Sequence, residues 1–83
     1  MMDIKSIKLG DNVLFENKWG DLTTATVNEL ESDSIDIVKK DVLFLHNKKV
    51  DLLGVKMESG YLKGHNAIID YESIMGINGE VIL

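Results

Sequence analysis

The stretch that decides the fold is residues 12–27, NVLFENKWGDLTTATV. In its first part, Val13 and Phe15 alternate with two residues of the opposite face, which is typical of a half-buried strand. In its last part, residues 23–27 are rich in β-branched side chains, which favour a second strand. The NKWGD segment between them contains Gly20, which is free to take a positive φ. The pattern therefore predicts a hairpin whose loop holds the only tryptophan of the chain.

Turn-forming residues recur about every eight to twelve residues along the whole chain, with short apolar runs between them. The chain has no proline, so its turns must depend on Gly, Asn, Asp and Ser. This spacing is typical of small all-β domains. We therefore predict a mostly-β fold, a small barrel or sandwich of about five to seven short antiparallel strands, with one short helical or 3₁₀ turn.

Two further strands are expected in the middle of the chain. Residues 34–38 alternate, and we expect Ile35 and Ile37 to point inward and Asp36 to point outward. Residues 42–45 are apolar on both faces, which predicts the most buried strand of the fold, with Phe44 in an inward position.

The segment 47–57 permits two interpretations. Val50, Leu53 and Met57 have helical spacing, and Gly54 could end a short helix. As a strand, the same segment alternates, and Gly54 would mark a bulge or bend. We favour the strand because strands are expected on both sides of it.

The segment 67–77, AIIDYESIMGI, is also ambiguous. Its apolar residues form a helical stripe, yet its two ends are strand-like and the polar residues 70–73 fit one tight helical turn. We favour strand, single turn, strand. The following pair Asn78-Gly79 is the strongest short hairpin signal of the chain, and it precedes residues 80–83.

Two stretches resemble the SH3-like small barrels of the Tudor and KOW kind. Residues 67–77 are similar to the last two strands of such barrels, which are joined by a single 3₁₀ turn. The stretch LGDNVLFENKWGDLTTATVNELESDSIDI, residues 9–37, resembles their opening strands. Together the two stretches cover about half of the chain, and the resemblance implies a binding module. The matching positions in the opening stretch are Gly10, Asp11, Val13, Gly20, Ala25, Val27, Ile35 and Ile37.

Composition limits the function further. The 83 residues predict one small domain over 1–83, and no cysteine is present to form a disulfide or a thiolate metal site. The net charge is −5, and all nine basic residues are lysines. Without arginine, an acidic domain lacks the usual electrostatic footprint of a nucleic-acid binder. No apolar run approaches the ~20 residues that span a bilayer, and the first residues are too polar for a secretory signal. We therefore expect a cytoplasmic protein that contacts no membrane.

Catalytic and metal-binding patterns are not found. His46 and His65 stand alone in turn-like positions, whereas metal sites need clustered ligands. The acidic segment 29–36 lacks the ligand order of a calcium loop. The serines have no nucleophile-elbow context, and the glycines follow no phosphate-loop spacing. We predict that the chain is not an enzyme and that it binds no cofactor or metal.

The function that the sequence favours is a small non-catalytic protein-binding module. A short acidic chain without cysteine, proline or enzyme motifs is also typical of phage or mobile-element accessory proteins, which inhibit a partner by protein–protein contact. The tryptophan and the acidic turns would then form the contact. The candidate binding residues are Trp19, Asp21, Glu29, Glu31, Asp33 and Tyr61.

Trp19 has two competing roles in this interpretation. It can fold back to seal one end of a thin core, or it can stand out as a contact, and we favour sealing. A methyl-lysine cage needs three or four aromatic side chains, and only Trp19, Tyr61 and Tyr71 could line one. These three come from distant loops, so we do not expect a cage.

Two alternatives remain open. A nucleic-acid-binding barrel would use the lysine patch Lys39, Lys40, Lys48 and Lys49, with Lys63 as a further contact. The C-terminal residues 79–83, GEVIL, would form an edge strand that either closes the protein's own sheet or pairs with a second copy in a homo-oligomer.

Overall fold

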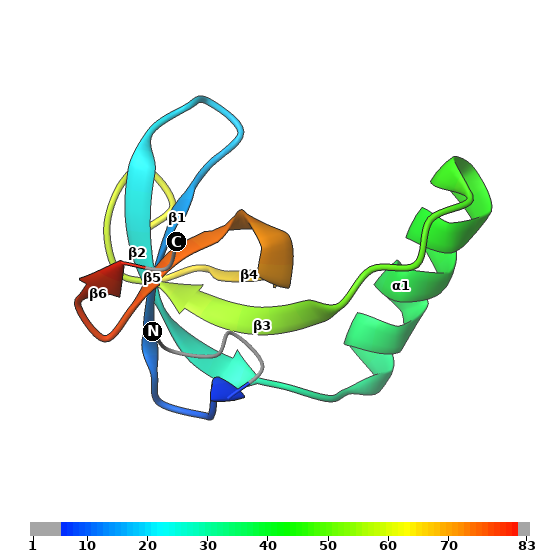
Figure 1. Ribbon diagram of the computed structural model, residues 1–83, viewed down its shortest axis with the longest axis horizontal. Coiled ribbons are helices and arrows are strands. Elements are labelled where there is room, and N and C mark those ends of the chain that lie inside the picture. The colour runs from blue at the N-terminus through cyan, green and yellow to red at the C-terminus, as the bar shows by residue number, and fades with distance from the viewer. Residues whose placement is uncertain (1–5, 82–83) are drawn as a thin grey trace.

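Six antiparallel strands form one open sheet in the computed structural model, which describes residues 6–81 (Figure 1). The strand order is β4-β3-β2-β1-β5-β6. The mostly-β prediction, the number of strands and the 3₁₀ turn are thereby confirmed. In chain order the elements are β1 (Asn12–Glu16), β2 (Leu22–Glu29), α1 (Asp33–His46), β3 (Leu52–Met57), β4 (Asn66–Asp70), the 3₁₀ turn η2 (Tyr71–Ser73), β5 (Ile74–Ile77) and β6 (Glu80–Val81).

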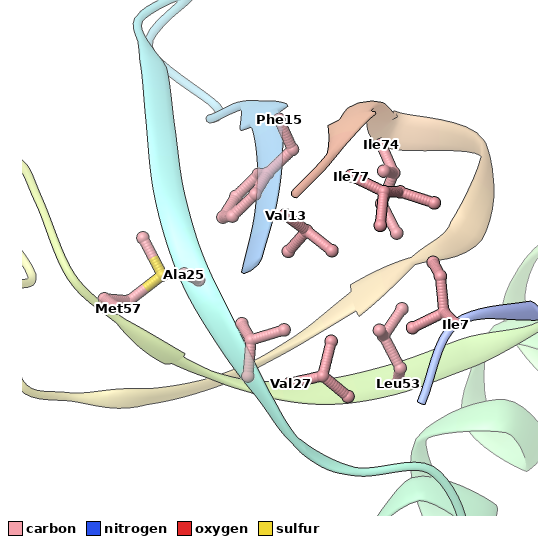
Figure 2. Close-up of a cluster of buried hydrophobic side chains, with 10 residues drawn as sticks. Ile7, Val13, Phe15, Ala25, Val27, Leu53, Met57, Ile74 and Ile77 are labelled. Carbon is pink, nitrogen blue, oxygen red and sulfur yellow. The ribbon is translucent and has the colours of Figure 1, made fainter. Parts of the chain in front are cut away.

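The core lies on the inner face of the bent sheet, as Figure 2 shows. Side chains alternate across a strand, so every second residue of β1, β2 and β3 points into it. This arrangement confirms the inward positions expected for Val13 and Phe15. Burial of each large apolar side chain contributes about 1.5–3 kcal/mol. The buried members are Ile7, Val13, Phe15, Ala25, Val27, Leu53, Val55, Met57, Ile74 and Ile77.

The last strands follow the predicted order of strand, single turn and strand. η2 leads the chain from β4 into β5, and β5 pairs with β1 through Val13 opposite Ile77. A tight turn then joins β5 to β6, with φ of 51° at Asn78 and 85° at Gly79. β6 therefore extends the protein's own sheet as its last strand. Of the segment 79–83, residues 82 and 83 lie outside the described part of the chain, and pairing with a second copy stays a prediction.

The predicted strands over 34–38 and 42–45 are wrong, because residues 33–46 form the helix α1. Its first turn is capped by Ser32, whose Oγ accepts a hydrogen bond from the Ile35 N–H at 3.1 Å. Asp33 and Asp36 lie in the same turn, where negative charge stabilises the helix dipole. Asn47 ends the helix in the left-handed conformation. A serine cap, early acidic residues and a terminal asparagine are helix signals that outweigh five residues of alternation.

Burial along α1 also differs from the prediction. Only Ile35 is buried among the residues of the helix. Phe44, which we expected to point inward, is 87% exposed, and Ile37 is 59% exposed. The helix stands at one side of the sheet in Figure 1 and does not cover the core. The apolar run 42–45 is thus spread around a helix and is not the centre of a sheet.

The strand interpretation of the segment 47–57 is confirmed for residues 52–57, which form β3. The predicted irregularity at Gly54 is present, since the register between β2 and β3 shifts opposite it, between Val27 and Glu29. A Cβ atom at Gly54 would lie 2.9 Å from the Cβ of Glu29. Because only glycine permits this approach, β2 can bend toward α1 at this position.

A buried carboxylate fastens the N-terminal loop to the β5–β6 turn. The Oδ2 of Asp11 accepts a hydrogen bond from the Lys8 N–H at 3.0 Å, and its Oδ1 accepts one from the Asn78 side-chain amide at 3.2 Å. These bonds favour the charged form, so the pKa of Asp11 lies below its ordinary value, mainly because of the Lys8 N–H.

We predict that Asp11→Asn lowers stability most at neutral pH. A carboxyl whose pKa is depressed by folding contributes stability above its unfolded pKa, and the contribution is lost as the pH falls through the folded pKa. The difference in urea midpoint between wild type and Asp11→Asn should therefore be larger at pH 7 than at pH 2.5. Asp21→Asn, which removes an exposed charge, is the control and should change the pH 7 midpoint less. An equal difference at both pH values would contradict the assigned hydrogen bonds.

Candidate functional site

Hydrogen bonds within the β1–β2 loop fix the backbone around Trp19. The Asn17 side chain accepts hydrogen bonds from the N–H groups of Trp19 and Asp21, both at 3.0 Å. Gly20 takes a φ of 86° and donates its N–H to the Asn17 carbonyl at 3.0 Å. The asparagine turn and the glycine together fix the loop backbone and leave the indole ring free to make contacts.

Trp19 is 56% exposed and does not belong to the buried core. The expectation that it seals one end of the core is therefore wrong. The Lys18 ammonium lies 4.7 Å from the centre of the indole ring, within the range of a cation–π contact. The ring is held by its loop and by this contact, and much of its surface stays in water.

A groove of about 570 Å³ lies between this loop, the helix and the edge of the sheet. Its walls are mostly apolar and come from five separate segments of the chain. We call it the helix–sheet groove and define it by Trp19, Val38, Val42, Val50, Leu62 and Ile68. Exposed apolar surface of this kind is typical of protein-contact sites.

The helix, a loop and a strand position four of the residues that line the groove. Val38 and Val42 are four residues apart on α1, so they share one helix face. Leu62 is presented by the loop after β3, whose Gly64 N–H donates to the Met57 carbonyl at 2.8 Å. Ile68 comes from β4, which leads into η2.

The predicted acidic contacts are spread over two regions. Asp21 lies beside the tryptophan loop, two residues after Trp19. Glu29 is at the end of β2, and Glu31 and Asp33 follow at the start of α1. None of these four lines the helix–sheet groove. The charge of Asp33 stabilises the start of α1, and a contact role for all four residues stays a prediction.

The three candidate cage aromatics are not brought into the groove together, because Tyr61 and Tyr71 do not line it. Tyr61 is 92% exposed on the loop after β3. Tyr71 packs against the core, and this burial, together with the nearby charge of Asp51, raises the pKa of its hydroxyl.

The lysine patch spreads over α1 and the loop after it. Lys39 and Lys40 belong to the helix, and Lys48 and Lys49 follow its end. The Lys48 ammonium lies 3.5 Å from a carboxylate oxygen of Glu72, between two exposed side chains, and such pairs contribute little to stability. Lys63 lies on the loop after β3. A nucleic-acid role for these lysines stays a prediction.

Sequence reasoning missed every groove residue except Trp19. Val38 and Val42 were assigned to predicted strands, so their shared helix face was not recognised. The spacing of Ile35, Val38 and Val42 at i, i+3 and i+7 was the signal for that face. No local signal marks Leu62 or Ile68, because their proximity to the helix arises from strand pairing.

Within residues 6–81 the structure contains no group of three or more histidine, aspartate or glutamate side chains that could hold a metal ion. None of the described helices has the length and hydropathy needed to cross a membrane. No protein-family model matches the chain, and comparisons with curated proteins and with solved structures give no match. The groove itself is therefore the basis for the functional argument.

We predict that Trp19→Ala lowers the free energy of unfolding by about 1 kcal/mol or less, because the ring lies outside the core and loses mainly the contact with Lys18. Phe15→Ala is the contrasting variant and should cost about 3–5 kcal/mol, since Phe15 is buried in the core. Urea unfolding followed by far-UV circular dichroism measures both. A loss of 3 kcal/mol for Trp19→Ala would show that the ring supports the core after all.

Proposed function

We propose that this protein is a small non-catalytic protein-binding module and that it contacts its partner through the helix–sheet groove. In this proposal it acts by occupying a surface of the partner, as an accessory or inhibitor protein does. The observation that supports it most directly is the exposed Trp19 at the wall of an apolar groove. Tryptophan is among the residues that contribute most to binding at protein interfaces.

The groove has the properties expected of a contact site for a protein segment. Its volume of about 570 Å³ holds several large side chains, and its walls come from both the rigid sheet and the helix. The backbone around Trp19 is fixed by hydrogen bonds of its loop before any partner arrives. Such preorganisation lowers the entropy lost on binding and so increases affinity.

The groove-facing side of α1 and its outer side can be compared by matched substitutions. Val42 faces the groove, whereas Phe44 lies about 200° further around the helix and is exposed. Both residues are apolar and belong to the second half of α1. Substitution of each by serine therefore separates binding in the groove from binding on the outer side of the helix.

We predict that Trp19→Ala and Val42→Ser each weaken partner binding at least tenfold, because each removes an apolar wall of the groove, and that Phe44→Ser changes it less than twofold. The measurement is capture of host proteins on the immobilised full chain, followed by titration of the captured partner against each variant. Isothermal titration calorimetry measures each affinity, because Trp19→Ala removes the only tryptophan of the chain and with it the fluorescence signal.

Circular dichroism of each variant checks that it remains folded. Loss of capture with Phe44→Ser and not with Trp19→Ala would place the contact on the outer side of the helix and would contradict the groove as the site. Equal capture by all variants would contradict the proposed function of the groove altogether.

A further inference from the structure

β4 is an edge strand whose outer side has no partner strand within residues 6–81. It pairs with β3 only, through residues 66–70 opposite 52–56. Small proteins normally protect such an edge with proline, lysine or a covering element. The edge here is Asn-Ala-Ile-Ile-Asp, which contains neither proline nor lysine. The outer edge of β4 can therefore pair with another strand.

The register shows which backbone groups are available. The Met57 N–H donates to the His65 carbonyl at 2.9 Å, and the Tyr71 N–H donates to the Asp51 carbonyl at 3.0 Å. In an antiparallel pair the residues that face the partner strand alternate with those that face away. Since 65 and 71 face β3, Ala67 and Ile69 do so as well, and Ile68 turns its N–H and C=O outward.

These outward groups are not used by the fold. No other described residue forms a hydrogen bond with the N–H or the C=O of Ile68. The carbonyl of Asp70 already accepts a bond from the Ser73 hydroxyl at 2.9 Å, which leaves its N–H as the next outward donor. An incoming strand would therefore find a donor and an acceptor at Ile68 and a second donor at Asp70.

The free edge of β4 lies in the helix–sheet groove. Ala67 and Ile69 line the groove from the core side of the sheet, and Ile68 and Asp70, which alternate with them along β4, belong to the opposite face. Val38 of α1 lines the same groove. A second hollow of about 390 Å³ is lined by residues of β2, β3 and the start of α1, and it shares Ala67 and Ile68 with the groove. Together the two hollows border β4 from Asn66 to Asp70, and we call them the channel.

The charges around this channel favour a basic ligand. Glu29 lines the second hollow, and Glu16 and Asp70 line the groove. Among residues 6–81, Lys18 is the single basic residue that lines either of them. A second copy of the chain would bring another net charge of −5, whereas a segment with lysine or arginine at its ends is complementary.

We propose that an extended apolar segment of a partner protein, flanked by lysine or arginine, binds along β4 as an additional strand of the sheet. This inference rests on the proposed function and states its binding mode. Main-chain hydrogen bonds to Ile68 and Asp70 align the segment, and alternate side chains enter the groove against Trp19 and Val42. Affinity then comes from the backbone and from the apolar walls, and specificity from the spacing of side chains.

The test uses a displayed library of random twelve-residue peptides, selected against the full chain at low ionic strength. Strand addition predicts selected peptides with apolar residues at every second position and basic residues near the ends. Each peptide is then made with N-methyl groups on every second residue, in both registers. N-methylation of the residues whose N–H groups face β4 should weaken binding at least tenfold, because it removes the donors to β4. N-methylation of the alternate residues, whose N–H groups face away from β4, should change binding less than twofold. Selected peptides with helical spacing, or equal binding of both methylated forms, would overturn the proposal.

The protein offers a matched pair of variants at the same position. Ile68→Pro removes the outward N–H without removing a bond to β3, and Ile68→Val keeps it. We expect at least tenfold weaker peptide binding for Ile68→Pro and a clearly smaller loss for Ile68→Val, which keeps the N–H and shortens the side chain in the groove by one methyl group, measured by the fluorescence of Trp19. If Ile68→Pro does not fold by circular dichroism, the methylated peptides decide the question.

The outcomes separate this inference from the proposed function. Peptide binding that is weakened by Trp19→Ala but not by Ile68→Pro or N-methylation would leave the groove as a binding site and reject strand addition. Failure to select any peptide would also reject strand addition, while capture of host proteins still tests the groove. A dimer by light scattering that Ile68→Pro dissociates would show that a second copy covers β4 and would overturn the proposed partner.

Discussion

The pairing of β5 with β1 is the constraint on which the rest of the structure depends. It places Ile77 opposite Val13 and so brings the end of the chain to the same core as the first hairpin. To reach β1, the chain must leave β4 through the η2 turn. Within residues 6–81, β4 is consequently left with one neighbour, β3, and becomes an edge of the sheet. The same pairing that completes the core thus creates the free edge beside the groove.

The helix α1 is not stabilised by the strand pairing that forms the sheet. It is capped at Ser32 and Asn47, and Ile35 is its one buried residue. Val38 and Val42 line the groove. Because most helical stability in proteins comes from burial of an apolar face, a helix that leaves Phe44 and Ile37 in water has unused apolar surface. The helix lies at the side of the sheet (Figure 1), and from there its residues Val38 and Val42 line the groove.

The fold was predictable wherever the pattern was local. Alternation predicted β1, and the β-branched residues 23–27 predicted β2. The polar residues 70–73 predicted the turn between β4 and β5, and Asn78-Gly79 predicted the last hairpin. The helix was not predicted because residues 34–38 satisfy a period of two over a short window, and the run 42–45 has no period at all. Over the full span 33–46 the caps and the i, i+3, i+7 spacing favour a helix, so the error came from the length of the window.

The sequence by itself determined the inward face of the hairpin strands, the loop that carries Trp19 and the acidic, cysteine-free surface, because each depends on neighbouring residues or on composition. The tertiary structure alone decided that Trp19 lines one groove together with residues of α1 and with Leu62 and Ile68. Their proximity results from the pairing of β4 with β3 and from the direction in which α1 leaves the sheet. Contacts between residues so far apart in the chain carry no local signal, since they are fixed only when the whole sheet has formed.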